Sequence, residues 1–162
     1  MATWEKDQSM LFIDFGDEPS TPEWKRVRKS TVFDLAFNPE TETQDYIDQR
    51  FPTDILKSYK PSMDQETMLE EGDELFEAMF ELMQSLPTGT SAIKPALFVF
   101  PKKATDPATS FVAWKVDCTI TFSNYNTVDR KLSFSLAFAG DIDYGSVAVS
   151  AGAPTFTSDS ET

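Results

Sequence analysis

The sequence predicts a mainly β fold of the α+β class: an antiparallel β-sandwich or partial barrel flanked by one α-helix. Two long runs in the second half alternate apolar and polar residues, as strands with one buried face do. One convincing segment has the periodicity of an amphipathic helix, which is expected to pack on one side of the strands. The 162 residues contain no repeat and no Gly/Ser linker, so we expect a single domain over residues 1–162.

Three short apolar runs in the first half predict strands. Because successive side chains of a strand alternate, Phe33, Leu35 and Phe37 would share one face of the third run. The predicted strands are Leu11–Phe15, Trp24–Val27 and Thr31–Phe37.

A polar segment follows these strands. Asn38–Arg50 has little apolar content, and we interpret it as a long loop or extended arm that reaches to about residue 62. The stretch Leu56–Leu69 alternates weakly, and Pro61 would confine it to an edge position or a bulge.

The predicted helix covers residues 73–86. Asp73 is a suitable N-cap, Glu74 and Glu77 favour the positive end of the helix dipole, and Pro87 marks the stop. Its apolar stripe consists of Leu75, Met79, Leu82, Met83 and Leu86.

The second half contains the clearest strands. Trp114–Phe122 and Leu132–Phe138 alternate strictly, and the asparagines of Asn124–Thr127 predict a turn between them. Gly140 and Gly145 are expected to bracket a bend. The polar end of the chain, from residue 157, is expected to fray, and residues 158–162 are expected to be disordered. Two further strands are predicted at Ala96–Phe100 and Ser146–Ser150.

Composition excludes several kinds of chemistry. There are 27 acidic residues against 14 Lys and Arg, a net charge of −13, no histidine and one cysteine. Catalytic nucleophiles that need a histidine base and zinc sites that contain histidine are therefore excluded. Cys118 is best interpreted as a small core residue. Strong negative charge disfavours tight binding of nucleic acid or anionic lipid. We expect no cofactor, and neither a signal peptide nor a membrane span is recognisable.

Two groups of acidic residues are candidates for metal binding or catalysis. Asp141-Ile-Asp143-Tyr-Gly145 begins like a calcium loop, but its twelfth position is Gly152 instead of a bidentate glutamate. The carboxylates around Glu70 and Glu71 would suit a carboxylate-only hydrolase, although a solvated acidic helix start explains them more simply. We therefore predict no catalytic residue and no metal site.

The basic and tryptophan residues do not indicate a nucleic-acid site. In a strand, Lys25 and Lys29 would point away from Arg26 and Arg28, so the cluster does not form one phosphate-binding face. No basic groove is apparent around the tryptophans, which we interpret as core or interface anchors: Trp4, Trp24 and Trp114.

Several segments, taken in order, resemble the major tail (tail tube) proteins of long-tailed bacteriophages and prophages. The likeness runs from about residue 10 to 157 and depends on motif order, since no single motif is diagnostic. The segments are Gln44–Asp48, Pro52-Thr53, Ser58–Ser62, Glu71-Gly-Asp73, the helix from Leu75-Phe76, Phe138–Val147 and Pro154–Thr157.

The resemblance implies a non-enzymatic virion protein, made in the bacterial cytoplasm, that forms hexameric rings. The rings would stack into a tube for genome passage and meet other tail proteins, such as the tape measure and terminator. It implies ring-to-ring contacts by residues 1–10 and Phe37–Ser62, and an inter-subunit role for Tyr144–Thr157. The candidate contact residues are Trp4, Tyr46, Phe51, Tyr59, Pro61, Tyr144 and Phe156.

Strand alternation also supplies a candidate lumen wall. A wall without Lys and Arg clusters would avoid the phosphate attraction that makes DNA stick. The candidate lumen-facing residues are Asp117, Thr119, Thr121, Ser133 and Ser135, for which the outer surface of a sandwich is an equally acceptable position. A tail terminator or head–tail joining ring is the alternative function, and a carboxylate-only hydrolase is a weaker one.

Overall fold

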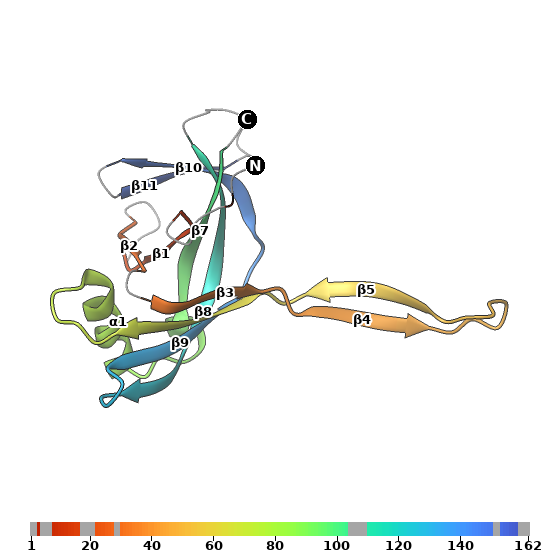
Figure 1. The fold of residues 1–162 in the computed structure, drawn as a ribbon, viewed down its shortest axis with the longest axis horizontal. Coiled ribbons are helices and arrows are strands. Elements are labelled where there is room, and N and C mark those ends of the chain that lie inside the picture. Colours follow the sequence, from red (N-terminus) through yellow and green to blue (C-terminus); the bar gives the residue numbers. More distant parts are fainter. Residues whose placement is uncertain are drawn as a thin grey trace.

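The computed structural model describes residues 3, 8–16, 22–27, 30–103, 110–150 and 153–158. A β-rich body carries one α-helix on one side and a two-stranded arm that projects from it (Figure 1). The predicted mainly β fold with one flanking helix is confirmed. Within the described ranges, neither the α-helix nor the short 3₁₀-helix has the length and apolarity that crossing a bilayer requires.

Nine strands form one antiparallel sheet. The order along its main path is β2-β1-β7-β8-β9-β6-β3, while β10 pairs with β8 and β11 beside this path. The strands are β1 (Met10–Asp14), β2 (Trp24–Arg26), β3 (Ser30–Ala36), β6 (Ser62–Met68), β7 (Ile93–Lys103), β8 (Phe111–Asn126), β9 (Lys131–Phe138), β10 (Asp143–Ser150) and β11 (Ala153–Ser158).

Strand β8 connects the parts of this sheet. One of its edges pairs with β7 as far as Thr119. Its other edge pairs first with β10, over residues 111–115, and then with β9, over residues 118–126. Because β10 and β9 follow each other along a single edge, the long strand β8 links two groups of strands.

Apolar side chains gather on both faces of the central strands. On one face, Ala96 and Phe98 of β7 join Val116, Cys118 and Ile120 of β8 in the larger core. On the other face, the alternate residues of β7, Leu97 and Val99, pack with Phe12, Ala113 and Val147 in a smaller core. A strand buried on both faces gives a continuous apolar run, which explains the unalternating sequence from Ala96 to Phe100.

Helix α1 (Glu74–Gln84) covers the larger core. Asp73 is its N-cap, as predicted, and the Asp73 carboxylate accepts a hydrogen bond from the backbone N–H of Leu75. Leu75 and Met79 are buried. The helix ends two residues earlier than predicted, and Leu86, assigned to the apolar stripe, is exposed with a positive φ of 47°. A short 3₁₀-helix, η1 (Gly89–Ala92), then leads into β7.

The bend predicted between Gly140 and Gly145 is present at residues 139–142, but Gly145 lies beyond it. Gly145 lies inside β10, where a Cβ would approach the Thr157 carbonyl oxygen to 2.2 Å and the Phe156 ring to 2.7 Å. A glycine is required at position 145 because of this close approach, and not because of a turn. The prediction of a frayed end was wrong for Thr157 and Ser158, which belong to β11. The Ser158 hydroxyl donates a hydrogen bond to the Asp143 carboxylate at 2.6 Å. Residues 159–162 lie outside the described part of the chain.

The turn between β8 and β9 begins later than predicted. β8 continues through Asn124 to Asn126, and the turn occupies residues 127–130. The Asn126 side-chain oxygen accepts hydrogen bonds from the backbone N–H groups of Val128 and Asp129, at 3.0 and 3.1 Å. Asn126 therefore stabilises this turn from the position that directly precedes it.

The segment interpreted as a loop or extended arm forms a β-hairpin. Its strands β4 (Pro39–Gln44) and β5 (Thr53–Tyr59) pair with each other and form a separate two-stranded sheet. The hairpin, called the arm below, extends away from the body between β3 and β6 (Figure 1). Pro61 lies between β5 and β6 and not within a strand, and its carbonyl accepts the N–H of Phe138 at 3.1 Å.

Candidate assembly surfaces

A polar face covers one side of the strands β3, β6, β9 and β8. The five residues predicted to line a lumen lie on it, because the residues that alternate with them in β8 and β9 are buried in the larger core. The structure adds acidic residues of β3 and β6 to the same face. We define the polar sheet face as Asp34, Asp64, Glu66, Asp117, Thr119, Thr121, Ser133 and Ser135.

The register aligns these side chains in rows across the strands. Thr121 pairs with Ser135, Ser135 pairs with Asp64, and Asp64 pairs with Asp34, so one row crosses all four strands. Glu66 pairs with Ser133 in the next row of this face. Asp34, Asp64 and Glu66 could not be assigned to this face from the sequence, because β6 lies between β9 and β3 and its local pattern does not encode this pairing order.

The charge of the polar sheet face is mostly negative. It holds four carboxylates, of which Glu66 is 3.6 Å from the ammonium group of Lys131. Asp34 and Asp64 are exposed and directly opposite each other, an arrangement that costs a sheet stability. Such a face repels phosphate groups.

Two strand edges beside the polar sheet face are available for pairing. Within the described residues, β3 pairs only with β6, which leaves its outer edge free. Pairing between β7 and β8 stops at Thr119, so the edge of β8 from Ile120 to Asn126 has no partner strand in the part of the chain that the structure describes. Free edges are templates for pairing with another chain.

The arm carries several exposed apolar side chains on β5 and in its turn. An isolated two-stranded hairpin is at best marginally stable in water, so such an arm is suited to being covered by a partner. Tyr46 and Phe51, two of the predicted contact residues, lie in the turn that ends the arm. The exposed apolar residues of the arm and its root are Phe37, Tyr46, Ile47, Phe51, Ile55, Leu56 and Tyr59. Phe37 was predicted to end the third strand, but β3 ends at Ala36, and Phe37 follows it with an exposed side chain.

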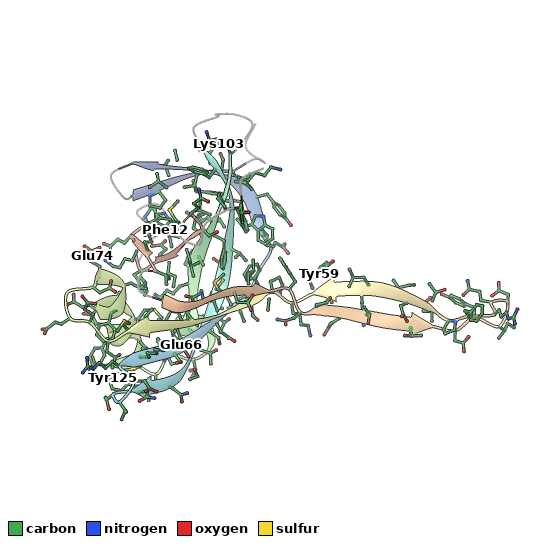
Figure 2. All side chains as sticks on the ribbon, viewed as in Figure 1. Phe12, Tyr59, Glu66, Glu74, Lys103 and Tyr125 are labelled. Atoms are coloured by element: carbon green, nitrogen blue, oxygen red, sulfur yellow. The ribbon has the colours of Figure 1, made fainter. Side chains whose placement is uncertain are left out.

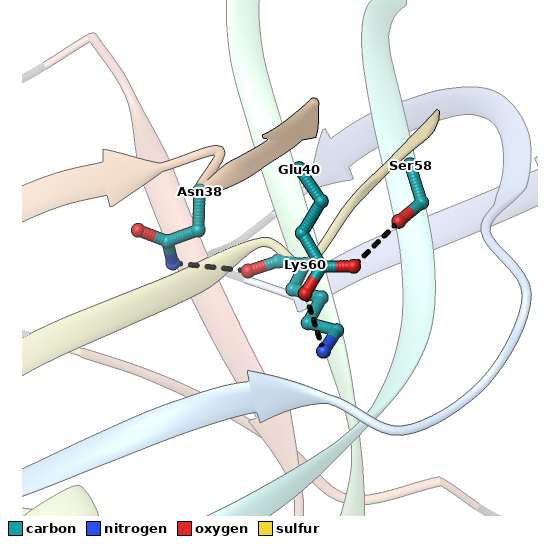
Figure 3. A network of polar contacts seen from close by, with 4 residues as sticks. All are labelled: Asn38, Glu40, Ser58 and Lys60. Carbon is teal, nitrogen blue, oxygen red and sulfur yellow. Dashed lines mark hydrogen bonds and ion pairs between the residues drawn. The ribbon is translucent and has the colours of Figure 1, made fainter. Parts of the chain in front are cut away.

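Polar contacts fix the root of the arm (Figure 3). The ammonium group of Lys60 is 2.7 Å from one carboxylate oxygen of Glu40, and the Ser58 hydroxyl donates to the other at 3.0 Å. These hydrogen bonds lower the pKa of Glu40, with that to Lys60 contributing most. Asn38 has a positive φ of 45° and donates from its side-chain amide to the carbonyl of Lys60 at 3.0 Å. These four residues are called the arm clasp below.

A groove of about 650 Å³ lies beside the arm root and brings together three of the predicted contact residues. Tyr59 and Pro61 lie on its arm side, while Tyr144 lies at the start of β10. This arm-base groove is lined by Tyr59, Lys60, Pro61, Ser62, Ala137, Phe138, Gly140, Asp141, Ile142 and Tyr144.

The other predicted contact residues lie elsewhere. Phe156 packs against the smaller core, and its ring centroid is 5.9 Å from the ammonium group of Lys115. Trp24 and Trp114 are partly buried against the two cores, as expected for anchors. Trp4 lies outside the described residues, as do Arg28 and Lys29 of the basic cluster and most of residues 1–10.

The structure does not gather the carboxylates of the alternative hydrolase hypothesis into a cleft. Glu70 and Glu71 lie in the exposed segment before α1, while a second groove, between α1 and the β1–β2 region, is lined by other acids, including Glu74, Glu77 and Glu81. The described residues contain no cluster of three or more acidic or cysteine side chains able to hold a metal ion. Cys118 is fully buried, and burial raises the pKa of its thiol to about 12.

No family model matches the chain, and no curated protein matches it. The solved structures that resemble it include two chains that are matched over nearly their whole length. A chain from the tail of an empty GTA particle, computed with helical refinement and C6 symmetry, has a TM-score of 0.58 and 11% identity, covering 88% of this chain and 98% of that one. A chain from the tube-terminating cap of the anti-feeding prophage has a TM-score of 0.51 and 12% identity, covering 89% and 93%. The chain therefore has a tail-tube-like fold, which is not specific to long-tailed phages.

Proposed function

We propose that the chain is a structural protein of a phage-type tail, assembling as hexameric rings that stack into a tube. The observation that carries this proposal is the polar sheet face, which is bounded by two free strand edges on a chain with a tail-tube-like fold. Pairing the edge of β3 in one copy with the edge Ile120–Asn126 of β8 in the next would cover both. Such a head-to-tail contact closes into a ring when its rotation is an integral fraction of a turn.

Six copies would form a pore wide enough for a duplex. The C6 symmetry of the similar tail supports the number six. Four strands from each copy give a closed sheet of about 24 strands, which at about 4.8 Å spacing and about 40° tilt measures roughly 45–50 Å between opposite backbones.

In this arrangement the polar sheet face lines the pore. Its carboxylates repel DNA phosphates and its hydroxyl groups carry no charge that attracts them, so a genome passes without binding. The larger core and α1 then lie on the outer side of the ring, because they occupy the opposite face of the same strands.

The arm supplies the contact between rings. Its exposed apolar side chains need cover, and its direction continues that of β3 and β6, which would form the pore wall (Figure 1). We assign to contacts between subunits or rings the residues Tyr46, Phe51, Tyr59, Pro61 and Tyr144. A tape-measure protein and a terminator protein are the other tail proteins that we expect the tube to meet.

A tube terminator is the second candidate function, favoured by the likeness to a tube-terminating cap. A terminator or head–tail joining protein would form single rings that do not stack. The length of the assemblies in electron micrographs therefore separates the two functions.

Negative-stain electron microscopy of the purified protein at rising concentration tests the proposal. We expect rings of six and then tubes. A variant in which residues 39–59 are replaced by a short glycine-rich turn should fold but not stack, because the Lys60 N–H already bonds the Phe37 and Asn38 carbonyls at 3.1 and 3.3 Å across the arm root. A strictly monomeric protein at high concentration would contradict the proposal. Glycoside cleavage that is lost in Glu70→Gln or Glu71→Gln would support a hydrolase instead.

A further inference from the structure

We propose that the arm-base groove holds the tip of the arm of a second copy of this chain. The arm tip is defined as residues 45–52, between β4 and β5. This inference rests on the proposed stacking of rings and names the surface that receives each arm.

The groove is lined in part by aromatic side chains, namely Tyr59, Phe138 and Tyr144. The ring of Tyr144 packs edge-on against Trp114 at 6.0 Å, and Trp114 packs edge-on against Phe100 at 5.0 Å. Tyr144 and Tyr59, on opposite sides of the groove, nevertheless remain 55% and 57% exposed. An aromatic side chain that is held in place and still exposed, as Tyr144 is, is typical of the residues that dominate binding energy at interfaces.

The arm tip carries matching apolar side chains. Ile47 is fully exposed and Phe51 is 72% exposed, and the guanidinium of Arg50 lies 5.6 Å from the centre of the Phe51 ring. Burying two large apolar side chains in an aromatic groove is favourable. The charges are complementary as well, since Arg50 of the tip can approach the exposed Asp141 at the rim of the groove.

The tip cannot enter the groove of its own chain. β5 has seven residues, so the arm holds its tip roughly 25–30 Å from its root, where Tyr59 lines the groove (Figure 2). A surface and its complement that are held apart on one chain can pair only between chains. Such a head-to-tail contact repeats without limit unless it closes.

The dimensions favour a copy displaced along the arm. β6 also has seven residues, and its far end lies beside the β8–β9 turn, where the Leu69 N–H bonds the Arg130 carbonyl at 3.0 Å. The arm continues the direction of β6 (Figure 1). A second copy that follows the first by roughly one strand length therefore avoids overlap and presents its groove near the arm tip, while its Val128 turn faces the root of that arm.

Disulfide cross-linking tests this pairing, and the native cysteine does not interfere because Cys118 is fully buried. The test variant carries Ile47→Cys in the tip and Ala137→Cys, an exposed position of the groove. The matched control carries Ile47→Cys and Val128→Cys, which is 89% exposed at the other end of the sheet. After mild oxidation of the assembled protein, we expect a covalent ladder from the test variant and none from the control on a non-reducing gel.

The outcomes separate this inference from the proposed function. Normal tubes without a ladder, or equal ladders from both variants, overturn the assignment of the groove. A ladder without hexameric rings in micrographs supports the groove and contradicts the stacked-ring function.

A mixing experiment gives an independent readout. A tip variant (Ile47→Asp with Phe51→Asp) and a groove variant (Tyr144→Asp) should each form only single rings, with circular dichroism as the control for folding. Mixed, they should form pairs of rings and nothing longer, since only one type of junction is intact. Full tubes from the groove variant alone would overturn the inference.

Discussion

Asp34 and Asp64 lie directly opposite each other on the neighbouring strands β3 and β6, and both carboxylates are exposed on the polar sheet face. Opposed like charges destabilise a sheet, so this pair does not serve the stability of the isolated chain. The proposed pore wall, which would be negatively charged, gives a reason for this pair that folding does not.

Asp64→Asn should therefore stabilise the chain. Removing the repulsion between opposed carboxylates is expected to raise the free energy of unfolding by about 0.2–1 kcal/mol, measured by urea denaturation at low salt. The gain should shrink in high salt, which screens exposed charges. Asp117→Asn is the control, because Asp117 pairs with Pro95 instead of an acid. An equal or salt-independent gain in both variants would contradict this origin.

Gly145→Ala should destabilise the body of the protein. The added methyl group would meet the Thr157 carbonyl at 2.2 Å and the Phe156 ring at 2.7 Å, so β11 must move. Overpacking of this kind costs about 1–3 kcal/mol of the free energy of unfolding.

Gly140→Ala provides the matched control for this substitution. The nearest heavy atom to a Cβ at Gly140 is the Asp117 Cβ at 4.0 Å, an ordinary contact, so little change in stability is expected. Equal thermal and urea stability of the two variants would show that β11 does not pack against Gly145 in solution.

Local patterns predicted the strands of the second half well. The alternation in β8 separated the buried Val116, Cys118 and Ile120 from the polar Asp117 and Thr119, because a strand with one buried face has a period of two. The N-cap at Asp73 was also predictable from its local sequence.

Non-local features were not predictable in the same way. Glycine is compatible with both a bend and a close approach, so the contact of Gly145 with β11 required the register of two strands. The arm lacks apolar alternation because it is exposed on both faces, and its pairing of Thr41 with Leu56 depends on a bulge. The row from Thr121 to Asp34 depends on a strand order that no single segment encodes.

Cys118 should be unreactive in the folded protein. Burial, with a further contribution from the charge of Asp117, raises the pKa of its thiol to about 12, so almost no thiolate is present at pH 8. A chromogenic thiol reagent should label the native chain very slowly and label it fully in concentrated urea. Rapid labelling without denaturant would show that the larger core opens at β8.

The arm clasp should weaken in acid. The folded pKa of Glu40 lies below its ordinary value of 4.5, chiefly because the carboxylate accepts hydrogen bonds from Lys60 and Ser58. A lowered carboxyl pKa stabilises the arm above the unfolded pKa, and this stabilisation is lost as the pH falls through the folded pKa. Amide hydrogen-exchange protection of β4 and β5 should therefore fall below about pH 4.5 in the native chain. Glu40→Gln should already show the lower protection at pH 7. Glu42→Gln, on the same strand, is the control and should behave like the native chain. Identical pH profiles for the native chain and both variants would rule out the clasp as the contact that holds the arm.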